Sequence, residues 1–196
     1  MSWQRHIPEV LVPYINKKLI GEQVVVKVAN SRRTKFGDYI NHPRKGHIIT
    51  VNNDLGKNAF FFTLCHELAH YFAFKEHGRW IKPHGKEWKL MFRGLLLPVC
   101  EIGHFPVKLN ALIIKHMNNP KASSAVDIYL KKELYTFDNK KIPTLLDDLE
   151  NDQLFMLGNG RKFKLIEKKR TRAYCLEING QRIYSIHKAT EVKPLT

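Results

Sequence analysis

The segment Cys65-His66-Glu67-Leu68-Ala69-His70 contains the pattern H-E-x-x-H, which constrains this chain more than any other feature. On an α-helix, residues four apart lie on one face, so His66 and His70 can present two imidazoles to one metal ion. Glu67 follows His66 directly, and its carboxylate can reach a water molecule on that ion. The pattern is typical of zinc peptidases, in which the glutamate acts as general base.

Apolar residues continue the helical pattern on both sides of the motif, from Ala59 to Ala73, and Gly78 predicts where the helix ends. Buried histidines and a buried glutamate need partners, because burying a polar group without one costs free energy. A bound metal ion supplies such partners. The alternative is two core histidines bonded to backbone carbonyls, with Glu67 at the surface.

A catalytic zinc site commonly has three protein ligands and leaves one position open. A third histidine six residues after His70 is excluded, because Glu76 occupies that position. We expect His84 to be the third ligand, since a chain reversal after the first helix can bring it back over that helix. Glu87 and His77 are the alternatives, in that order.

Two segments together resemble the SprT-like metalloprotease family, the bacterial relatives of Spartan: Thr-Leu-Cys-His-Glu-Leu-Ala-His at 63–70 and His-Gly-Lys-Glu-Trp at 84–88. Residues 32–39 and 47–52 resemble the strand, turn and strand that precede the catalytic helix in that family. The resemblance implies zinc ligands at His66, His70 and His84, and a catalytic Glu67. For Spartan it also implies proteolysis of proteins crosslinked to DNA.

One departure from the family concerns its C-terminal zinc ribbon, which is built on paired Cys-x-x-Cys motifs. The cysteines of this chain are Cys65, Cys100 and Cys175, and no two are close in sequence. A four-cysteine structural site is therefore not expected. Whatever follows the protease domain must be stable without that metal.

The formal net charge of +15 predicts attraction to polyanions, above all nucleic acid. Residues 1–60 contain 10 Lys and Arg against 4 Asp and Glu, and residues 151–196 contain 10 against 4 as well. The positive charge therefore flanks the catalytic helix. The alternative is a basic protein whose charge serves only solubility.

The basic residues that we consider as nucleic-acid contacts fall in two stretches: Arg32, Arg33, Lys35, Arg44 and Lys45, then Lys168, Lys169, Arg170 and Arg172. Tyr174 and Tyr184 lie near the second stretch, and basic residues interleaved with aromatic ones suit single-stranded nucleic acid. The alternatives are a solvated hairpin turn at the first stretch and a charged loop over a packed core at the second.

The expected fold class is α+β. A zincin-like helical domain would have a small N-terminal β-sheet packed on the H-E-x-x-H helix, and a small C-terminal antiparallel β-sheet or barrel would replace the zinc ribbon. The expected organisation is a protease domain at 1–136, a linker at 137–151 and a small basic β domain at 152–196.

Periodicity and turn signals give the expected elements. Asn52-Asn53-Asp54 is expected to cap the catalytic helix, Pro98 to end the next helix, and Asn179-Gly180 to form a hairpin turn. The remaining expectations are helices at 8–20, 107–117 and 125–135, the last opened by a capping box at 124–127, and strands at 24–28 and 47–51.

The expected function is that of a zinc-dependent endopeptidase with one catalytic Zn²⁺, acting on DNA-associated or DNA-crosslinked proteins. No apolar run approaches the length of a membrane span, the first residues lack a signal-peptide core, and unpaired cysteines suit a reducing interior. We therefore expect a cytoplasmic protein, or one associated with the nucleoid, without a membrane partner.

Two other functions remain open from the sequence. One is a nucleic-acid-binding module whose zinc site is structural, with Glu87 as a fourth ligand that closes it. The other is a zinc peptidase that cuts a regulatory protein. For the peptidase readings, Tyr71, His77 and Arg79 are equal candidates for the donor to the oxyanion.

Overall fold

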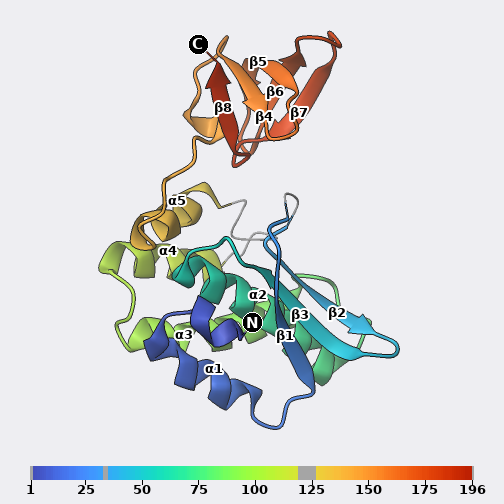
Figure 1. Cartoon of the computed structure of the whole chain (residues 1–196), viewed down its shortest axis with the longest axis vertical. Helices are drawn as coiled ribbons and strands as arrows, with labels where there is room; N and C mark the ends of the chain where they lie inside the picture. The colour runs from blue at the N-terminus through green and yellow to red at the C-terminus, as the bar shows by residue number, and fades with distance from the viewer. Residues whose placement is uncertain (1, 33–34, 119–126, 196) are drawn as a thin grey trace. The chain divides into compact units, whose positions relative to one another are not determined.

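The computed structural model describes residues 2–32, 35–118 and 127–195 (Figure 1). The chain forms two compact units, one of residues 1–124 and 129–140, the other of residues 125–128 and 141–196. The chain contains both helices and β-sheets, as expected for an α+β fold. None of the helices in these ranges is long and apolar enough to cross a lipid bilayer.

The first unit contains a three-stranded sheet made of β1 (Val24–Ala29), β2 (Gly37–His42) and β3 (Gly46–Asn52), in the order β1-β3-β2. The two expected strands, β1 and β3, pair in parallel, and β2 pairs antiparallel with β3. The hairpin therefore joins β2 to β3. Strand β2 was not predicted as a separate strand, and it forms one edge of the sheet.

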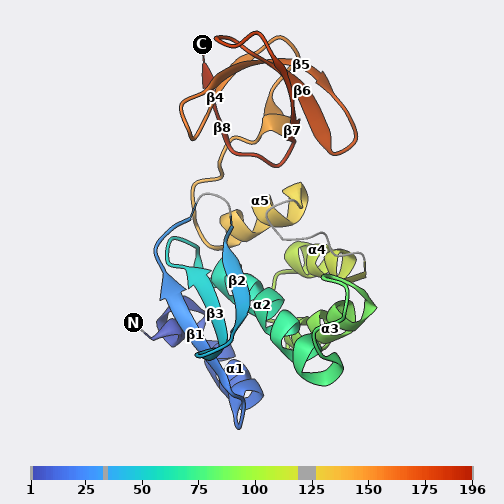
Figure 2. The same ribbon diagram turned by 90° about the vertical axis from the view of Figure 1, so that its right-hand side faces the viewer.

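Helix α2 (Lys57–His77) is the centre of the first unit, and it carries the H-E-x-x-H motif. Most of its side chains are buried around the whole circumference, which is typical of a helix inside a core. The sheet packs on one side of α2 and α3 (Lys86–Glu101) on the other (Figure 2). The motif therefore lies between a sheet and a helix.

The first turn of α2 is capped from a distant part of the chain, not by the residues just before it. The carboxylate of Asp138 accepts hydrogen bonds from the backbone N–H of Asn58 at 2.8 Å and of Ala59 at 2.9 Å. The expected cap at 52–54 is wrong: α2 begins at Lys57, and Asn52 instead bonds the backbone carbonyl of Lys35. A carboxylate suits this position, because it satisfies free N–H groups and the positive end of the helix dipole.

Helix α3 runs through Pro98 and ends at Glu101, so the expected end at Pro98 is wrong. A proline removes the hydrogen bond to the carbonyl four residues earlier. That residue is Gly94, which is exposed and has no side chain to crowd the proline ring. The lost bond is therefore tolerated in the last turn.

The N-terminal helix is shorter than the expected range of 8–20, since a 3₁₀ turn at Glu9–Leu11 occupies the start of that range. The expected capping box at 124–127 begins outside the described residues, and the helix after it starts at Ile128 rather than at residue 125. The remaining helical elements of this unit are η1 (Trp3–His6), η2 (Glu9–Leu11), α1 (Val12–Leu19), α4 (Val107–Asn118) and α5 (Ile128–Phe137).

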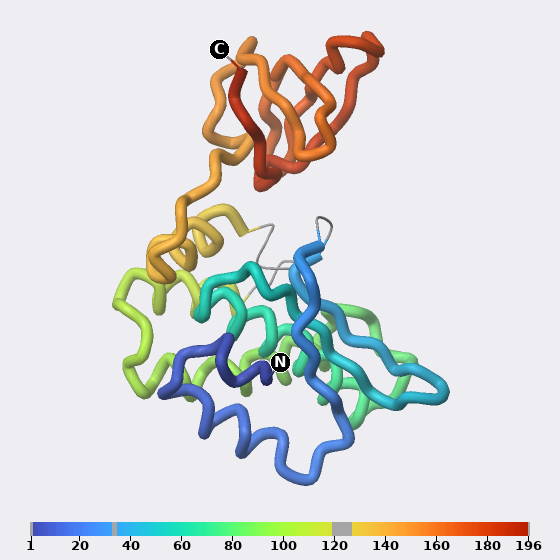
Figure 3. Tube along the Cα trace, in the orientation of Figure 1, coloured from blue at the N-terminus to red at the C-terminus, as the bar shows by residue number. Residues whose placement is uncertain are grey.

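The second unit is an antiparallel sheet in the order β7-β6-β5-β4-β8, whose strands curl around a small core (Figure 3). Asn179-Gly180 lies in the turn between β6 and β7, as predicted. The 3₁₀ helix η4 (Leu146–Asp148), within the expected linker, adds Leu146 to that core. The strands are β4 (Leu154–Leu157), β5 (Lys162–Lys168), β6 (Arg172–Glu177), β7 (Ile183–His187) and β8 (Val192–Leu195).

Candidate metal centre

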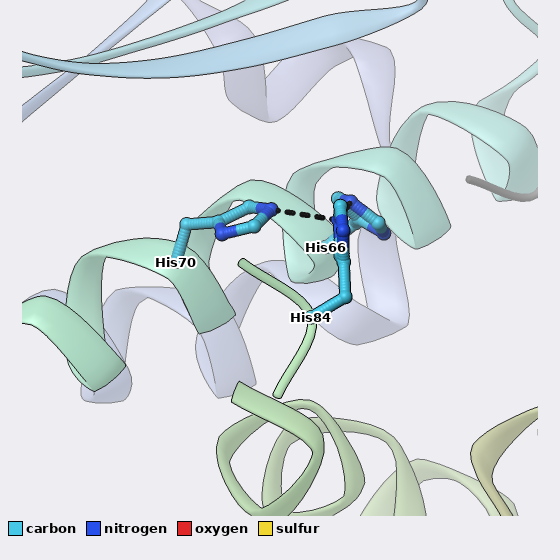
Figure 4. A group of neighbouring side chains, drawn as sticks. All are labelled: His66, His70 and His84. Atoms are coloured by element: carbon cyan, nitrogen blue, oxygen red, sulfur yellow. Dashed lines mark hydrogen bonds between the residues drawn. The ribbon is translucent and has the colours of Figure 1, made fainter. Parts of the chain in front are cut away.

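The structure brings His66, His70 and His84 together (Figure 4). His66 and His70 project from successive turns of α2, and His84 comes from the loop that leads into α3. The Nε2 atom of His84 lies 3.1 Å from the Nε2 atoms of both His66 and His70. One ligand atom from each residue lies within 4.8 Å of the other two.

These residues fit a zinc ion. Tetrahedral zinc with Zn–N bonds of about 2.0–2.1 Å holds its nitrogen ligands about 3.3 Å apart, close to the spacing seen here. Burial, together with the neighbouring imidazoles, lowers the pKa of His66 to about 2, and burial beside His84 lowers the pKa of His70 to about 4. The rings are therefore neutral near pH 7, which is the form that binds metal.

The backbone of the loop explains how His84 reaches the other two rings. His84 has a positive φ of 57°, a left-handed conformation that is uncommon outside glycine. The N–H of Gly85 bonds the carbonyl of Lys82 at 2.8 Å and closes the turn. A Cβ at position 85 would lie 2.8 Å from that same carbonyl, so the turn requires glycine there.

Trp88 forms a wall behind the three histidines, a role that the sequence did not reveal. It is fully buried, and its ring centroid lies 4.7 Å from those of His66 and His84 and 5.3 Å from that of His70. Its Nε1–H donates to the backbone carbonyl of His66 at 3.3 Å. The indole therefore excludes water from one side of the cluster and limits rotation of the imidazoles.

Glu67 lies under the edge strand β2. The backbone N–H of Tyr39 donates a hydrogen bond to its carboxylate. Burial, and then the nearby charge of Asp38, raise the pKa of Glu67 to about 8, while Arg32 acts in the opposite direction. A carboxylate whose pKa is raised toward neutrality suits a general base, and a bound dication would favour its charged form.

The two rival ligands lie outside the cluster. Among the described residues, the group of potential metal ligands contains neither Glu87 nor His77. The carboxylate of Glu87 lies 3.9 Å from the ammonium of Lys86, and His77 lies 3.8 Å from the carboxylate of Glu76. Three histidines therefore converge, which is the number that leaves a tetrahedral position open.

The three candidate oxyanion donors differ in their surroundings. The hydroxyl of Tyr71 is buried and donates to Glu22 at 2.7 Å, so it is already engaged. Arg79 is exposed and stacks on Trp80, and His77 is exposed beside an acidic side chain. The described contacts join none of the three to the histidine cluster.

The basic residues of the first stretch differ in the ion pairs and hydrogen bonds that they form within the protein. Arg32 is half-buried, forms an ion pair with Asp38 and donates to the side chain of Asn52 at 2.8 Å. Lys35 pairs with the same carboxylate at 3.1 Å, while Arg33 lies outside the described residues. Arg32 and Lys35 therefore brace the sheet beside Glu67.

Arg44 and Lys45 are exposed in the turn between β2 and β3. This turn lies at one end of the edge strand. Both side chains are free to contact a polyanion.

In the second unit, Lys168 donates to the carbonyl of Asp147 at 2.8 Å, and Arg172 donates to Ser185 at 2.8 Å. Arg170 is exposed. These side chains lie around the β5–β6 turn, which borders a cavity of about 210 Å³ lined by residues 169–174 and Ser185. Lys169 pairs with Glu167 within the turn.

Comparison with known proteins agrees with the site. The family model described as SprT-like matches residues 10–109 of this chain, which include all three histidines and Glu67. Protein SprT of Pseudomonas aeruginosa (strain LESB58) is 27% identical over 110 residues, which are 56% of this chain and 58% of that protein.

Protein SprT of Pseudomonas fluorescens (strain SBW25) is 28% identical over 83 residues, or 42% of this chain and 44% of that protein. The chain thus spans less than two thirds of the length of these curated relatives. The region matched by the family model lies within the unit that holds the histidine cluster. Because the family model matches more than half of the chain, this chain belongs to the SprT-like family.

Proposed function

We propose that this protein is a zinc-dependent endopeptidase that acts on proteins bound or crosslinked to DNA. The observation that carries the proposal is the convergence of three imidazole nitrogens, two of them from α2, the helix that also carries the buried Glu67. Membership of the SprT-like family supports a metalloprotease-type role. The curated relatives are matched over only part of their length, so support for the substrate comes from the charge and the edge strand of this chain.

A zinc ion held by His66, His70 and His84 would supply polarisation of a peptide carbonyl and activation of water. Glu67 would accept the proton of the attacking water and pass it to the leaving amine. The N–H of Tyr39 orients this carboxylate by donating to it. Trp88 keeps solvent away from one side of the imidazoles, which strengthens electrostatic interactions there.

The edge strand suggests how a polypeptide substrate is held. β2 is at the end of the strand order, so one of its edges has no strand partner in the described sheet. An extended segment can add to such an edge through main-chain hydrogen bonds. A substrate held there would lie beside Glu67, because Gly37 and Tyr39 of β2 contact its side chain.

The positive charge supports a polyanionic partner. The net charge of +15 gives long-range attraction to DNA, and the exposed Arg44, Lys45 and Arg170 are available for phosphates. A protein attached to DNA would then be concentrated near the enzyme. The competing idea of a closed, structural zinc site requires a fourth ligand, and Glu87 does not join the cluster.

The experiment is a comparison of wild type with Glu67→Gln, each purified with zinc. We expect one zinc per chain in both proteins, and cleavage of casein or histone by the wild type alone. Cleavage of a DNA-binding substrate should rise when DNA is added. Zinc-loaded wild type that cleaves nothing, with or without DNA, would refute the endopeptidase proposal. If DNA does not change the rate of cleavage, the peptidase proposal stands, but the proposal of a DNA-linked substrate is rejected.

A further inference from the structure

The loop between α2 and α3, residues 78–85, carries an exposed tryptophan. Trp80 is 87% exposed, whereas the other two tryptophans, Trp3 and Trp88, are buried. Tryptophan is highly buried on average, and it is enriched where proteins bind partners. An indole held in solvent by a short loop therefore indicates a contact surface.

A guanidinium lies over one face of this indole. The guanidinium carbon of Arg79 lies 4.6 Å from the centroid of the Trp80 ring, which is a cation–π contact. The exposure of the ring shows that the opposite side faces solvent. Arg79 thus places a positive charge beside the indole.

The surroundings of Trp80 are basic. Residues 75–93 contain six Lys and Arg against two Glu. Arg79 and Lys82 lie on the loop itself, are exposed, and form no ion pair among the described residues. Lys86, the first residue of α3, is exposed as well. Such a surface favours a polyanion over an average polypeptide segment.

We propose that loop 78–85 binds unpaired DNA, with one base stacked on the open face of Trp80 and the flanking phosphates paired with Arg79 and Lys82. Every base has a flat face that an aromatic ring can stack on, so such a site needs no particular sequence. A duplex hides these faces between its base pairs. The site is therefore selective for single strands.

This inference deepens the proposed function, because it names the surface that meets the DNA. The loop that carries Trp80 also carries His84, four residues later. A strand stacked on the indole is thereby held by the same loop that supplies the third histidine. Proteins attached to unpaired DNA would be presented to Glu67 in preference to free proteins.

The test uses the zinc-loaded full chain with Glu67→Gln, so that binding is measured without cleavage. Since Trp80 is the exposed tryptophan, oligo(dT) should quench the protein's fluorescence, and Trp80→Phe should remove most of that signal. Trp80→Ala should weaken oligo(dT) binding about tenfold or more, measured by fluorescence anisotropy of labelled DNA. Arg79→Ala and Lys82→Ala should each reduce the salt dependence of binding by about one phosphate contact.

Val107→Ala is the matched control, since Val107 is 88% exposed on α4 and outside the loop. It should bind oligo(dT) like the parent. Trp80→Ala with unchanged oligo(dT) affinity would overturn the inference, as would an equal loss for a duplex of the same length. A loss of casein affinity with unchanged DNA affinity would assign the loop to protein binding and overturn it too.

The two proposals fail separately. Suppose that oligo(dT) binding depends on Trp80 but the wild type cleaves no protein. This inference would then stand, and the peptidase proposal would be rejected. If the wild type cleaves protein but Trp80 has no role in DNA binding, the peptidase proposal would stand and this inference would be rejected.

Discussion

Gly37 of β2 lies directly against the side chain of Glu67. A Cβ at position 37 would lie 3.0 Å from Cγ and 3.1 Å from Oε1 of Glu67, and 2.8 Å from Cγ2 of Thr63. Two residues later, the N–H of Tyr39 donates to the same carboxylate. The edge strand therefore holds the glutamate from the side opposite to the helix.

Gly37→Ala should impair catalysis without removing a ligand or a catalytic group. The added methyl would displace Glu67 or Thr63, and overpacking of this kind costs about 1–3 kcal/mol. We expect the rate of peptide cleavage to fall about tenfold or more, with one zinc per chain retained. Gly94→Ala is the control, because no atom would lie within 4 Å of its Cβ. A variant at position 37 with the wild-type rate would contradict this role of β2.

His84→Ala should lose zinc, whereas His77→Ala should keep it. His84 is one of three converging histidines, while His77 is exposed and outside the cluster. Elemental analysis after dialysis against a weak chelator measures the difference. Removing zinc from the wild type with a strong chelator should lower its melting temperature, since the ion binds the folded state. Equal zinc retention by both variants would argue against the ligand role of His84.

Trp88→Phe should destabilise the zinc-loaded protein by about 1–3 kcal/mol. The change removes the hydrogen bond to the carbonyl of His66 and leaves space beside the three imidazoles. Zinc should also dissociate faster. Trp80→Phe is the same change at an exposed position and should alter neither property. Urea unfolding and competition with a chromogenic chelator provide the two measurements.

Asp38→Asn should make the free energy of unfolding less dependent on pH in the acid range. Burial opposes the charge of Asp38, but hydrogen bonds from Thr50, Arg32 and Lys35 outweigh it and hold its pKa below the usual value. Its contribution is therefore present above the usual pKa and is lost as the pH falls through the lower, folded value. The variant should be less stable than wild type at pH 7, and the difference should shrink below about pH 4.

Urea midpoints measured with a chelator present would test this, because zinc release then plays no part. Asp152→Asn serves as the control, since Asp152 is 79% exposed in its pair with Lys164 and such pairs contribute little. A difference between Asp38→Asn and wild type that stays constant down to low pH would show that the charge of Asp38 is not what stabilises the fold.

The histidine cluster could be predicted because its three residues are close together in the sequence. A spacing of four on a helix places His66 and His70 together, and the break at Gly85 allows the chain to return. The contact of Trp88 with the three imidazoles could not be predicted, because nothing in a sequence shows which ring an indole will pack against. The one sequence signal for it is a tryptophan four residues after a predicted ligand.

The elements that could not be predicted depend on distant partners. Strand β2 is a strand because it pairs with β3 and covers Glu67, and residues 37–42 lack a strong β-branched run of their own. Pro98 reads as a helix end, yet the exposed Gly94 one turn earlier tolerates the missing hydrogen bond. In both cases tertiary context outweighed local preference.

The hydrogen bonds between Asp138 and the start of α2 set the size of the smallest fragment that can keep the helix of His66 and His70 intact. The family match ends at residue 109, and the expected protease domain ends at 136, but the capping carboxylate lies beyond both. A truncation at either point would leave the first N–H groups of α2 facing no acceptor. An expression fragment meant to isolate the histidine site must therefore run past residue 138, to the boundary at Lys140.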